Sequence, residues 1–181
     1  MTFALSESIE VLERTPGTLA SFVSGLSDGW LACREGEGTW NVQEVIDHLI
    51  EGERHNWMPR LEMMLQDGEP QLFPPFDRFA HLDKQEAAGI QQSLDTFSIL
   101  RAQNVARLKA CITTDELLAR KGKHPAFGTV TIKQLLATWV VHDLTHMAQI
   151  TRVMAKRYQE DVGPWREYLG ILQERQGWSA D

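Results

Sequence analysis

Apolar residues recur with a helical period along four stretches of the chain, and no stretch carries a convincing strand pattern. In the first stretch, residues 5–26, an apolar residue returns every three or four positions. Pro16 interrupts it, and because proline disrupts a helix interior we expect a kink or a fresh start there. A loop follows, from residue 28 to residue 38.

The second stretch has a well-marked start. Asn41 can cap a helix N-terminus, and Glu44 stands three residues later, which is close to a capping box. The apolar face continues to Leu65, although Pro59 should bend or loosen the helix. A long irregular link follows, residues 67–85, and a connection of that length is usually functional or crosses one end of a bundle.

The third stretch spans roughly residues 86–111, and Arg101 falls inside its apolar seam. That arginine could be a snorkelling surface residue, with its charge in water, or it could face a cavity. Residues 119–130 are rich in turn-forming residues and allow at most one short hairpin.

The fourth and longest stretch opens with a second capping box, formed by Thr131 and Gln134. Its periodic pattern predicts a helix to about Tyr158. Pro164 breaks the pattern, and residues 165–175 can form a final short helix. The four stretches therefore predict an all-α fold: a four-helix bundle with long crossover-type connections and a short C-terminal helix.

Composition narrows the class of protein. The 181 residues fit a single domain, residues 1–181, with a hydrophobic core large enough to be stable without disulfide or metal cross-links. A net charge of −7 disfavours a nucleic-acid surface, and no stretch resembles a membrane span or a signal peptide. The two cysteines, Cys33 and Cys111, form neither a CxxC pair nor a disulfide framework. We therefore expect a cytoplasmic protein without nucleic-acid or membrane partners.

Histidines supply the candidate chemistry. His142 and His146 are four residues apart on the longest helix, so they share one face about 6 Å apart along the axis. His48 has an equivalent inward phase on the second helix. Three neutral imidazoles can bind a divalent transition metal and leave a position open, as in catalytic sites. Zinc is the first choice, with nickel or ferrous iron permitted; the alternative is a set of hydrogen-bonded core histidines.

Four further polar residues have weaker claims. His55 could contact a substrate, but an exposed position is the better expectation. His124 lies in a turn-rich loop that could cover the mouth of the site, although a purely structural role is favoured. His81 has no evident role. Asp143 is expected on a flank of its helix, from which it could reach a neighbouring helix.

Two segments carry a family resemblance. Residues 38–49 contain a tryptophan, then asparagine, glutamate and a His-Leu pair at fixed spacing, and residues 142–150 contain HxxxH followed by Gln-Ile. These segments, with the loops around residues 73–78 and 124–128, resemble the DinB-like (DinB/YfiT) superfamily from about residue 10 to 170. The resemblance implies a four-helix bundle, often a homodimer, that holds a divalent metal through three histidines. In this chain those are the histidines at 48, 142 and 146.

The resemblance also frames the expected activity, because some relatives transfer low-molecular-weight thiols such as bacillithiol, mycothiol or glutathione. We therefore expect a thiol-dependent S-transferase in which the metal lowers the pKa of a small-molecule thiol. A metal-dependent hydrolase is the rival, since Asp143 stands where the zincin HExxH motif has its general-base glutamate. A non-catalytic, stress-related protein that binds a metal or small ligand is the third possibility.

Overall fold

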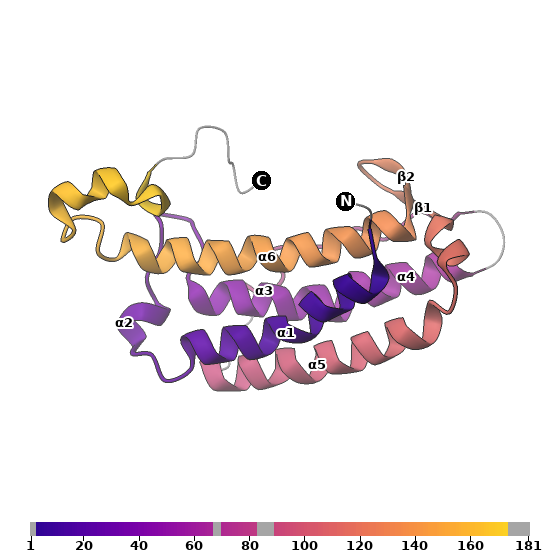
Figure 1. Cartoon of the computed structure of the whole chain (residues 1–181), viewed down its shortest axis with the longest axis horizontal. Helices are drawn as coiled ribbons and strands as arrows, with labels where there is room; N and C mark the ends of the chain where they lie inside the picture. The colour runs from indigo at the N-terminus through magenta and orange to yellow at the C-terminus, as the bar shows by residue number, and fades with distance from the viewer. Residues whose placement is uncertain (1–2, 67–69, 83–88, 174–181) are drawn as a thin grey trace.

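Four helical rods lie side by side in the computed structural model, which describes residues 3–66, 70–82 and 89–173 (Figure 1). The α-helices are α1 (Leu5–Val23), α2 (Asp28–Leu31), α3 (Val42–His55), α4 (Trp57–Leu65), α5 (Ile90–Cys111) and α6 (Ile132–Lys156). The 3-10 segments are η1 (Asp115–Ala119), η2 (Gly163–Tyr168) and η3 (Gly170–Leu172), and the strands are β1 (Lys121–His124) and β2 (Gly128–Thr131). The rods are α1, α3 continued by α4, α5 and α6, so the predicted four-helix bundle is confirmed.

Local sequence explains where the second rod begins and breaks. The Asn41 side chain accepts from the backbone N–H of Glu44, and the Glu44 carboxylate accepts from the backbone N–H of Asn41, both at 2.9 Å, as the capping box predicts. The bend expected from Pro59 is a break between two helices at Asn56. Pro59 lies in the first turn of α4, where its missing N–H costs least, so the break precedes it.

Helix α1 runs through Pro16 without interruption, so the expected fresh start is wrong. Proline has no N–H to donate to the carbonyl of Leu12, four residues earlier. That carbonyl instead accepts a hydrogen bond from Arg101 of α5, at 2.9 Å. A hydrogen bond from another helix thus replaces the one that Pro16 removes. The loop expected from residue 28 also contains a short helix, α2.

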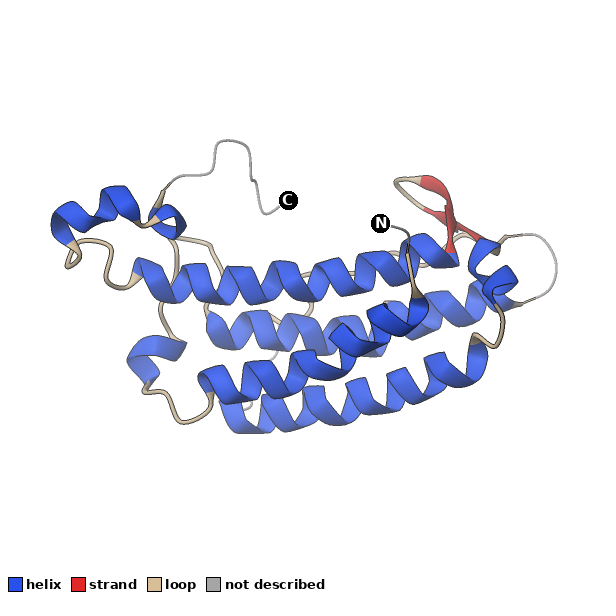
Figure 2. Cartoon of the chain, in the orientation of Figure 1, coloured by secondary structure: helices blue, strands red, loops and turns tan. Residues whose placement is uncertain are grey.

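Helix α6 begins at the predicted capping box and is preceded by the predicted hairpin. Thr131 Oγ1 accepts from the N–H of Gln134 at 3.3 Å, and the Gln134 side chain accepts from the N–H of Thr131 at 2.8 Å. Strands β1 and β2 pair antiparallel and are the only strands in the described residues (Figure 2). The N–H of Phe73 donates to the carbonyl of Lys123, which ties the loop after α4 to the hairpin.

The predicted short C-terminal helix is present as two 3-10 segments, η2 and η3, that break at Leu169, and residues 174–175 of that prediction lie outside the described residues. Trp165 and Tyr168 are exposed, and Leu172 is the buried side chain of η3. A short helix gains most of its stability from packing an apolar face, and this segment buries too little for a regular α-helix.

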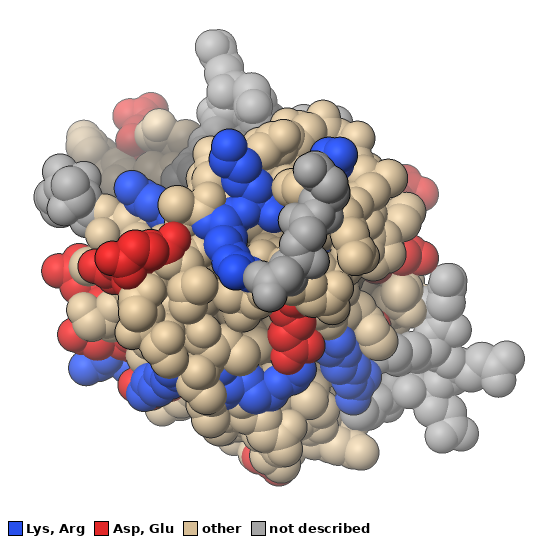
Figure 3. All heavy atoms as spheres, turned by 90° about the vertical axis from the view of Figure 1, so that its right-hand side faces the viewer, with Lys and Arg blue, Asp and Glu red and all other residues tan. Residues whose placement is uncertain are grey.

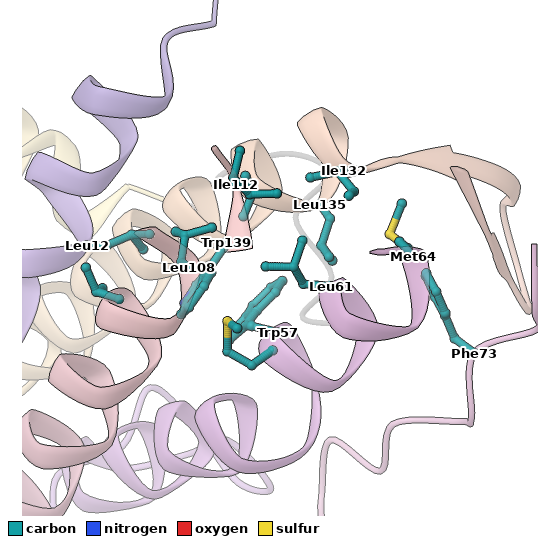
Figure 4. Packing of buried hydrophobic residues seen from close by; sticks show 13 residues of the cluster. Leu12, Trp57, Leu61, Met64, Phe73, Leu108, Ile112, Ile132, Leu135 and Trp139 are labelled. Carbon is teal, nitrogen blue, oxygen red and sulfur yellow. The ribbon is translucent and has the colours of Figure 1, made fainter. Parts of the chain in front are cut away.

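Two apolar clusters form the core. The first lies at the end of the bundle near the hairpin, where Trp57 of α4 stacks on Trp139 of α6 with ring centroids 5.7 Å apart (Figure 4). The second lies toward the α2 end and includes Ile46, Phe97 and Ile150. No helix among the described residues combines the length and the apolar composition that a membrane span needs.

Gly122 gives a test of the contact between the hairpin and the core. A Cβ at this position would lie 2.5 Å from the Phe73 ring, so we expect Gly122→Ala to cost about 1–3 kcal/mol of unfolding free energy. Gly17 is the control, because a Cβ there meets nothing within 4 Å in the middle of α1. Gly17→Ala should be neutral or stabilise by up to about 1 kcal/mol. Urea unfolding of both variants checks this, and equal effects would contradict it.

Candidate metal centre

The structure brings the three predicted histidines together from two helices. The Nε2 atom of His142 lies 3.2 Å from Nε2 of His48 and 3.1 Å from Nε2 of His146. One ring nitrogen from each residue lies within 4.8 Å of those of the other two. His48 comes from α3 and the other two from successive turns of α6, as the helical spacing predicts.

In two of the three imidazole rings, the nitrogen that points away from the cluster donates a hydrogen bond to an oxygen. Nδ1 of His48 lies 3.1 Å from the backbone carbonyl oxygen of Arg78, and Nδ1 of His146 lies 2.8 Å from the side-chain oxygen of Gln149. Carbonyl oxygens only accept, so each Nδ1 carries the proton and donates it. Each Nε2 therefore presents a lone pair toward the centre of the cluster, the arrangement typical of metal-binding histidines.

These lone pairs fit a cation. His142 can supply at most one N–H at Nε2, so it cannot satisfy both neighbouring lone pairs at once. Its Nδ1 is buried and makes no hydrogen bond within the described part of the chain. Imidazoles around a tetrahedral zinc ion, with Zn–N near 2.0–2.1 Å, have nitrogens about 3.3 Å apart. The spacings of 3.1 and 3.2 Å are close to that value, so the residues fit a divalent transition metal.

Burial keeps all three imidazoles neutral. Burial, assisted by the nearby His146, lowers the pKa of His48 from 6.5 to about 3. Burial also lowers the pKa of His142 well below its ordinary value, and it lowers the pKa of His146 against the opposing effect of the hydrogen bond that His146 donates to Gln149. Only neutral imidazole binds a metal, so the site is ready to do so at neutral pH.

Two aromatic rings that the sequence did not single out complete the wall of the cluster. The Trp40 ring lies 4.8 Å from the His48 ring and stacks at 6.3 Å on the His146 ring. His81, to which the sequence assigned no role, is buried, and its ring lies 4.6 Å from Trp40 and 5.5 Å from His48. The expectation for His81 is thus corrected, because the loop after α4 folds back over the triad.

Arg101 and Asp143 form a buried ionic network directly behind the histidines. Arg101 is 1% exposed, so the snorkelling alternative is wrong. Asp143 is fully buried, and from its place off the histidine face of α6 it reaches the neighbouring helix α5, as the sequence allowed. The Arg101 guanidinium donates to both Asp143 oxygens, at 2.5 and 2.9 Å, and to Glu53 Oε1 at 2.8 Å. Glu53 belongs to α3 and Asp143 follows His142 on α6, so the network joins the two helices that carry the histidines.

Further donors complete the network around Glu53. The indole N–H of Trp139 donates to Glu53 Oε1 at 3.0 Å. The side-chain amide of Asn104 donates to Glu53 Oε2 and to the Glu53 backbone carbonyl, both at 2.9 Å. Both carboxylate oxygens of Glu53 therefore have partners, which is the condition for burying such a group without a large penalty.

The two remaining histidines lie away from the triad. The side chain of His55 is 64% exposed and lies 3.6 Å from Glu51, in agreement with the expected exposed position. His124 belongs to β1, where it stacks on Phe127 at 4.5 Å and meets Phe73 edge-on. Among the described residues it makes no ring contact with the triad.

Comparison with known proteins identifies the family and agrees with the fold. Residues 11–150 match the sequence profile of the DinB superfamily, and the chain belongs to that family. The curated relative "Putative metal-dependent hydrolase YfiT" of Bacillus subtilis (strain 168) is 26% identical over 147 residues, 80% of this chain and 81% of the relative. "Putative metal-dependent hydrolase OB0782" of Oceanobacillus iheyensis is 26% identical over 155 residues, 84% and 87% of the two chains.

A solved structure is similar over most of its length. It is described as "YfiT from Bacillus subtilis is a probable metal-dependent hydrolase with an unusual four-helix bundle topology". The TM-score is 0.74 at 25% sequence identity, over 86% of this chain and 90% of the other. The family resemblance drawn from the sequence is therefore confirmed.

The buried network can be tested by removing its cation. Arg101→Met should lower the free energy of unfolding by about 3–5 kcal/mol, because it leaves Glu53 and Asp143 buried without a counter-charge. Arg14→Met is the control, because the Arg14–Glu10 pair is exposed and contributes at most about 1 kcal/mol. Denaturant unfolding measures both, and similar losses would contradict the assignment.

The low pKa values predict how the metal-free protein responds to acid. The pKa of each of His48, His142 and His146 is lower in the folded chain, so below about pH 6.5 the unfolded chain binds more protons at these residues and stability falls as the pH drops. From pH 7 to pH 5 the loss from His48 alone should reach about 2 kcal/mol, and His142 and His146 should add to it.

A chelator-treated sample unfolded in urea at both pH values gives this loss. His48→Gln should lose less stability than the wild type between pH 7 and pH 5, because one of the three groups no longer titrates. His55→Gln is the control, since its ring is largely in water. The same loss in all three proteins would rule out this account of the acid response.

Proposed function

We propose that the protein is a metal-dependent hydrolase whose divalent metal is held by His48, His142 and His146. The convergence of one ring nitrogen from each of the three histidines within 4.8 Å supports the proposal most strongly. Both relatives described above are named as metal-dependent hydrolases. Imidazole donors favour zinc, and they also accept nickel or ferrous iron.

An ion bound by three imidazoles keeps coordination positions open and lowers the pKa of a water or thiol that binds there. The chain's own residues keep the imidazoles in place. The hydrogen bonds from His48 to the Arg78 carbonyl and from His146 to Gln149 fix both rings and make their Nε2 atoms more basic. Trp40 packs against the same two rings and limits the space for bulk water beside them.

The general base of this hydrolase is not the one that the HExxH comparison suggested. Asp143 is adjacent to His142 on α6, so it points about 100° away around the helix. Both of its oxygens accept from Arg101 in the protein interior. Because these hydrogen bonds occupy the carboxylate, Asp143 supports the helix and does not take part in proton transfer at the histidines.

The position of Asp143 also favours a second candidate, thiol-dependent S-transfer to a small electrophile. A thiol is acidic enough that binding to a divalent metal deprotonates it without a protein base. This reaction would need only the three histidines and space for the small-molecule thiol. The two candidates share a metal site and differ in the nucleophile.

One set of assays tests both candidates. Elemental analysis of purified protein should find about one divalent ion per chain, and His146→Gln should lose it. Metal-loaded protein is then incubated with ester, amide and phosphoester substrates, and separately with thiols and a chromogenic electrophile. We expect hydrolysis that disappears after chelation, returns with metal, and is absent from His146→Gln but present in His55→Gln.

The outcomes are distinct. Conjugation of a thiol without hydrolysis would replace the first candidate by the second. Stoichiometric metal with neither reaction would favour the third possibility, a protein that binds a metal or small ligand without turnover. Wild-type protein that binds no transition metal would contradict both enzyme candidates and leave only the binding of a small ligand.

A further inference from the structure

Arg60 of α4 is a nearly buried cation, and the described part of the chain places no counter-charge beside it. Its residue surface is 8% exposed, and its guanidinium carbon lies 5.2 Å from the centre of the Phe73 ring. Within the described residues, no oxygen acceptor hydrogen-bonds to it and no carboxylate pairs with it. Arg101 is also buried but is surrounded by two carboxylates and a carbonyl. An unpaired buried charge is costly, so Arg60 is better suited to binding an anion than to holding the fold together.

His124 offers a second donor at the same aromatic ring. Its Nδ1 accepts from the backbone N–H groups of Ala126 and Phe127, at 3.2 and 3.3 Å. A neutral imidazole that accepts at Nδ1 carries its proton on Nε2, where it can donate. The His124 ring meets Phe73 edge-on, with ring centroids 6.3 Å apart. Burial and the positive charge of Arg60 lower the pKa of His124, which keeps the ring in this neutral form.

Two chain segments connect this pair of donors to the histidine triad. On α4, Trp57 lies one turn before Arg60, about 4.5 Å along the axis, and its ring is 5.0 Å from that of His142. On the loop, Phe76 comes three residues after Phe73, whose ring lies beneath Arg60. The Phe76 ring is 6.0 Å from the His48 ring. The donors and the triad are therefore joined by short stretches of the same two segments, three residues apart on α4 and three apart on the loop.

We propose that Arg60 and His124 bind the oxyanion, a carboxylate or phosphate, of the small molecule on which the metal centre acts. Arginine suits this role because its planar fork matches both anions with two parallel hydrogen bonds. The surroundings agree, since Lys and Arg side chains gather near the centre of the hairpin end of this otherwise acidic protein (Figure 3). That the anion belongs to the substrate rests on the proposed function; that an oxyanion binds here does not.

Anion binding is measured first on metal-free protein in the presence of a chelator. Millimolar phosphate or acetate should raise Tm along a saturable curve, whereas chloride at matched ionic strength should not. Amide NMR signals of Gly122 and His124 should shift along the same curve. Arg60→Met should weaken the binding at least tenfold, since a charged hydrogen-bonding group is lost.

Arg54→Met is the matched control, because Arg54 has a 40% exposed side chain and pairs with Glu51. It should bind the anion as the wild type does. Equal protection of all three proteins, or no saturable response in the wild type, would overturn the proposal. Stronger binding of phosphate than acetate would identify a phosphorylated substrate class, and the reverse order a carboxylate.

A structural role for Arg60 makes the opposite prediction about stability. Without anion, Arg60→Met should be at least as stable as the wild type, because it keeps the buried stem and removes an unpaired charge. A clear loss of Tm in both Arg60→Met and Arg60→Gln would assign Arg60 to the fold and overturn the proposal.

The link to substrate is tested separately. If a hydrolase or transferase reaction is found, Arg60→Met should raise KM at least tenfold for anionic substrates and leave neutral ones unchanged. An equal effect on both classes would overturn the assignment to the substrate. Failure to find any reaction would count against the proposed function alone, because the binding measurements need neither metal nor turnover.

Discussion

The burial of the Arg101 guanidinium is the constraint on which the rest of the bundle depends. The interior must supply acceptors for it, and they come from Leu12 of α1, Glu53 of α3 and Asp143 of α6. With Arg101 itself on α5, one side chain fixes the relative positions of all four rods. A helix that slid by one turn would leave a charge or a carbonyl unpaired in the core, at a cost of several kcal/mol.

The ion pairs around Arg101 determine the relative positions of the three histidines. His48 and Glu53 share α3, and His142 and Asp143 are neighbours on α6. The ion pairs through Arg101 therefore set the distance and register between the helices that bring the imidazoles together. Consecutive residues on α6 point toward two different polar centres, so the helix needs a broad buried face with α3 and α4 on one side and α1 on the other.

The sequence predicted the parts of this arrangement that depend on local spacing. Both capping boxes, the shared face of His142 and His146, and the inward phase of His48 follow from neighbours within a few residues. Arg101 and Asp143 could not be placed in this way, because each pairs with a residue 42 positions distant. A single apolar stripe along a helix also predicts one buried face, whereas α6 buries side chains on more than one face. The loop over the triad has no periodicity, so nothing local placed its side chains there.

The two buried arginines show how polar groups in one core can serve different ends. Arg101 pairs with two carboxylates, and these ion pairs hold the helices in position. Arg60 is 8% exposed and, within the described residues, has no carboxylate partner; it lies over an aromatic ring, which compensates a positive charge much less than a carboxylate does. Proteins tolerate such uncompensated groups mainly where function requires them, at some cost in stability. Burial alone therefore does not separate structural from functional charges in this fold; the presence or absence of acceptors does.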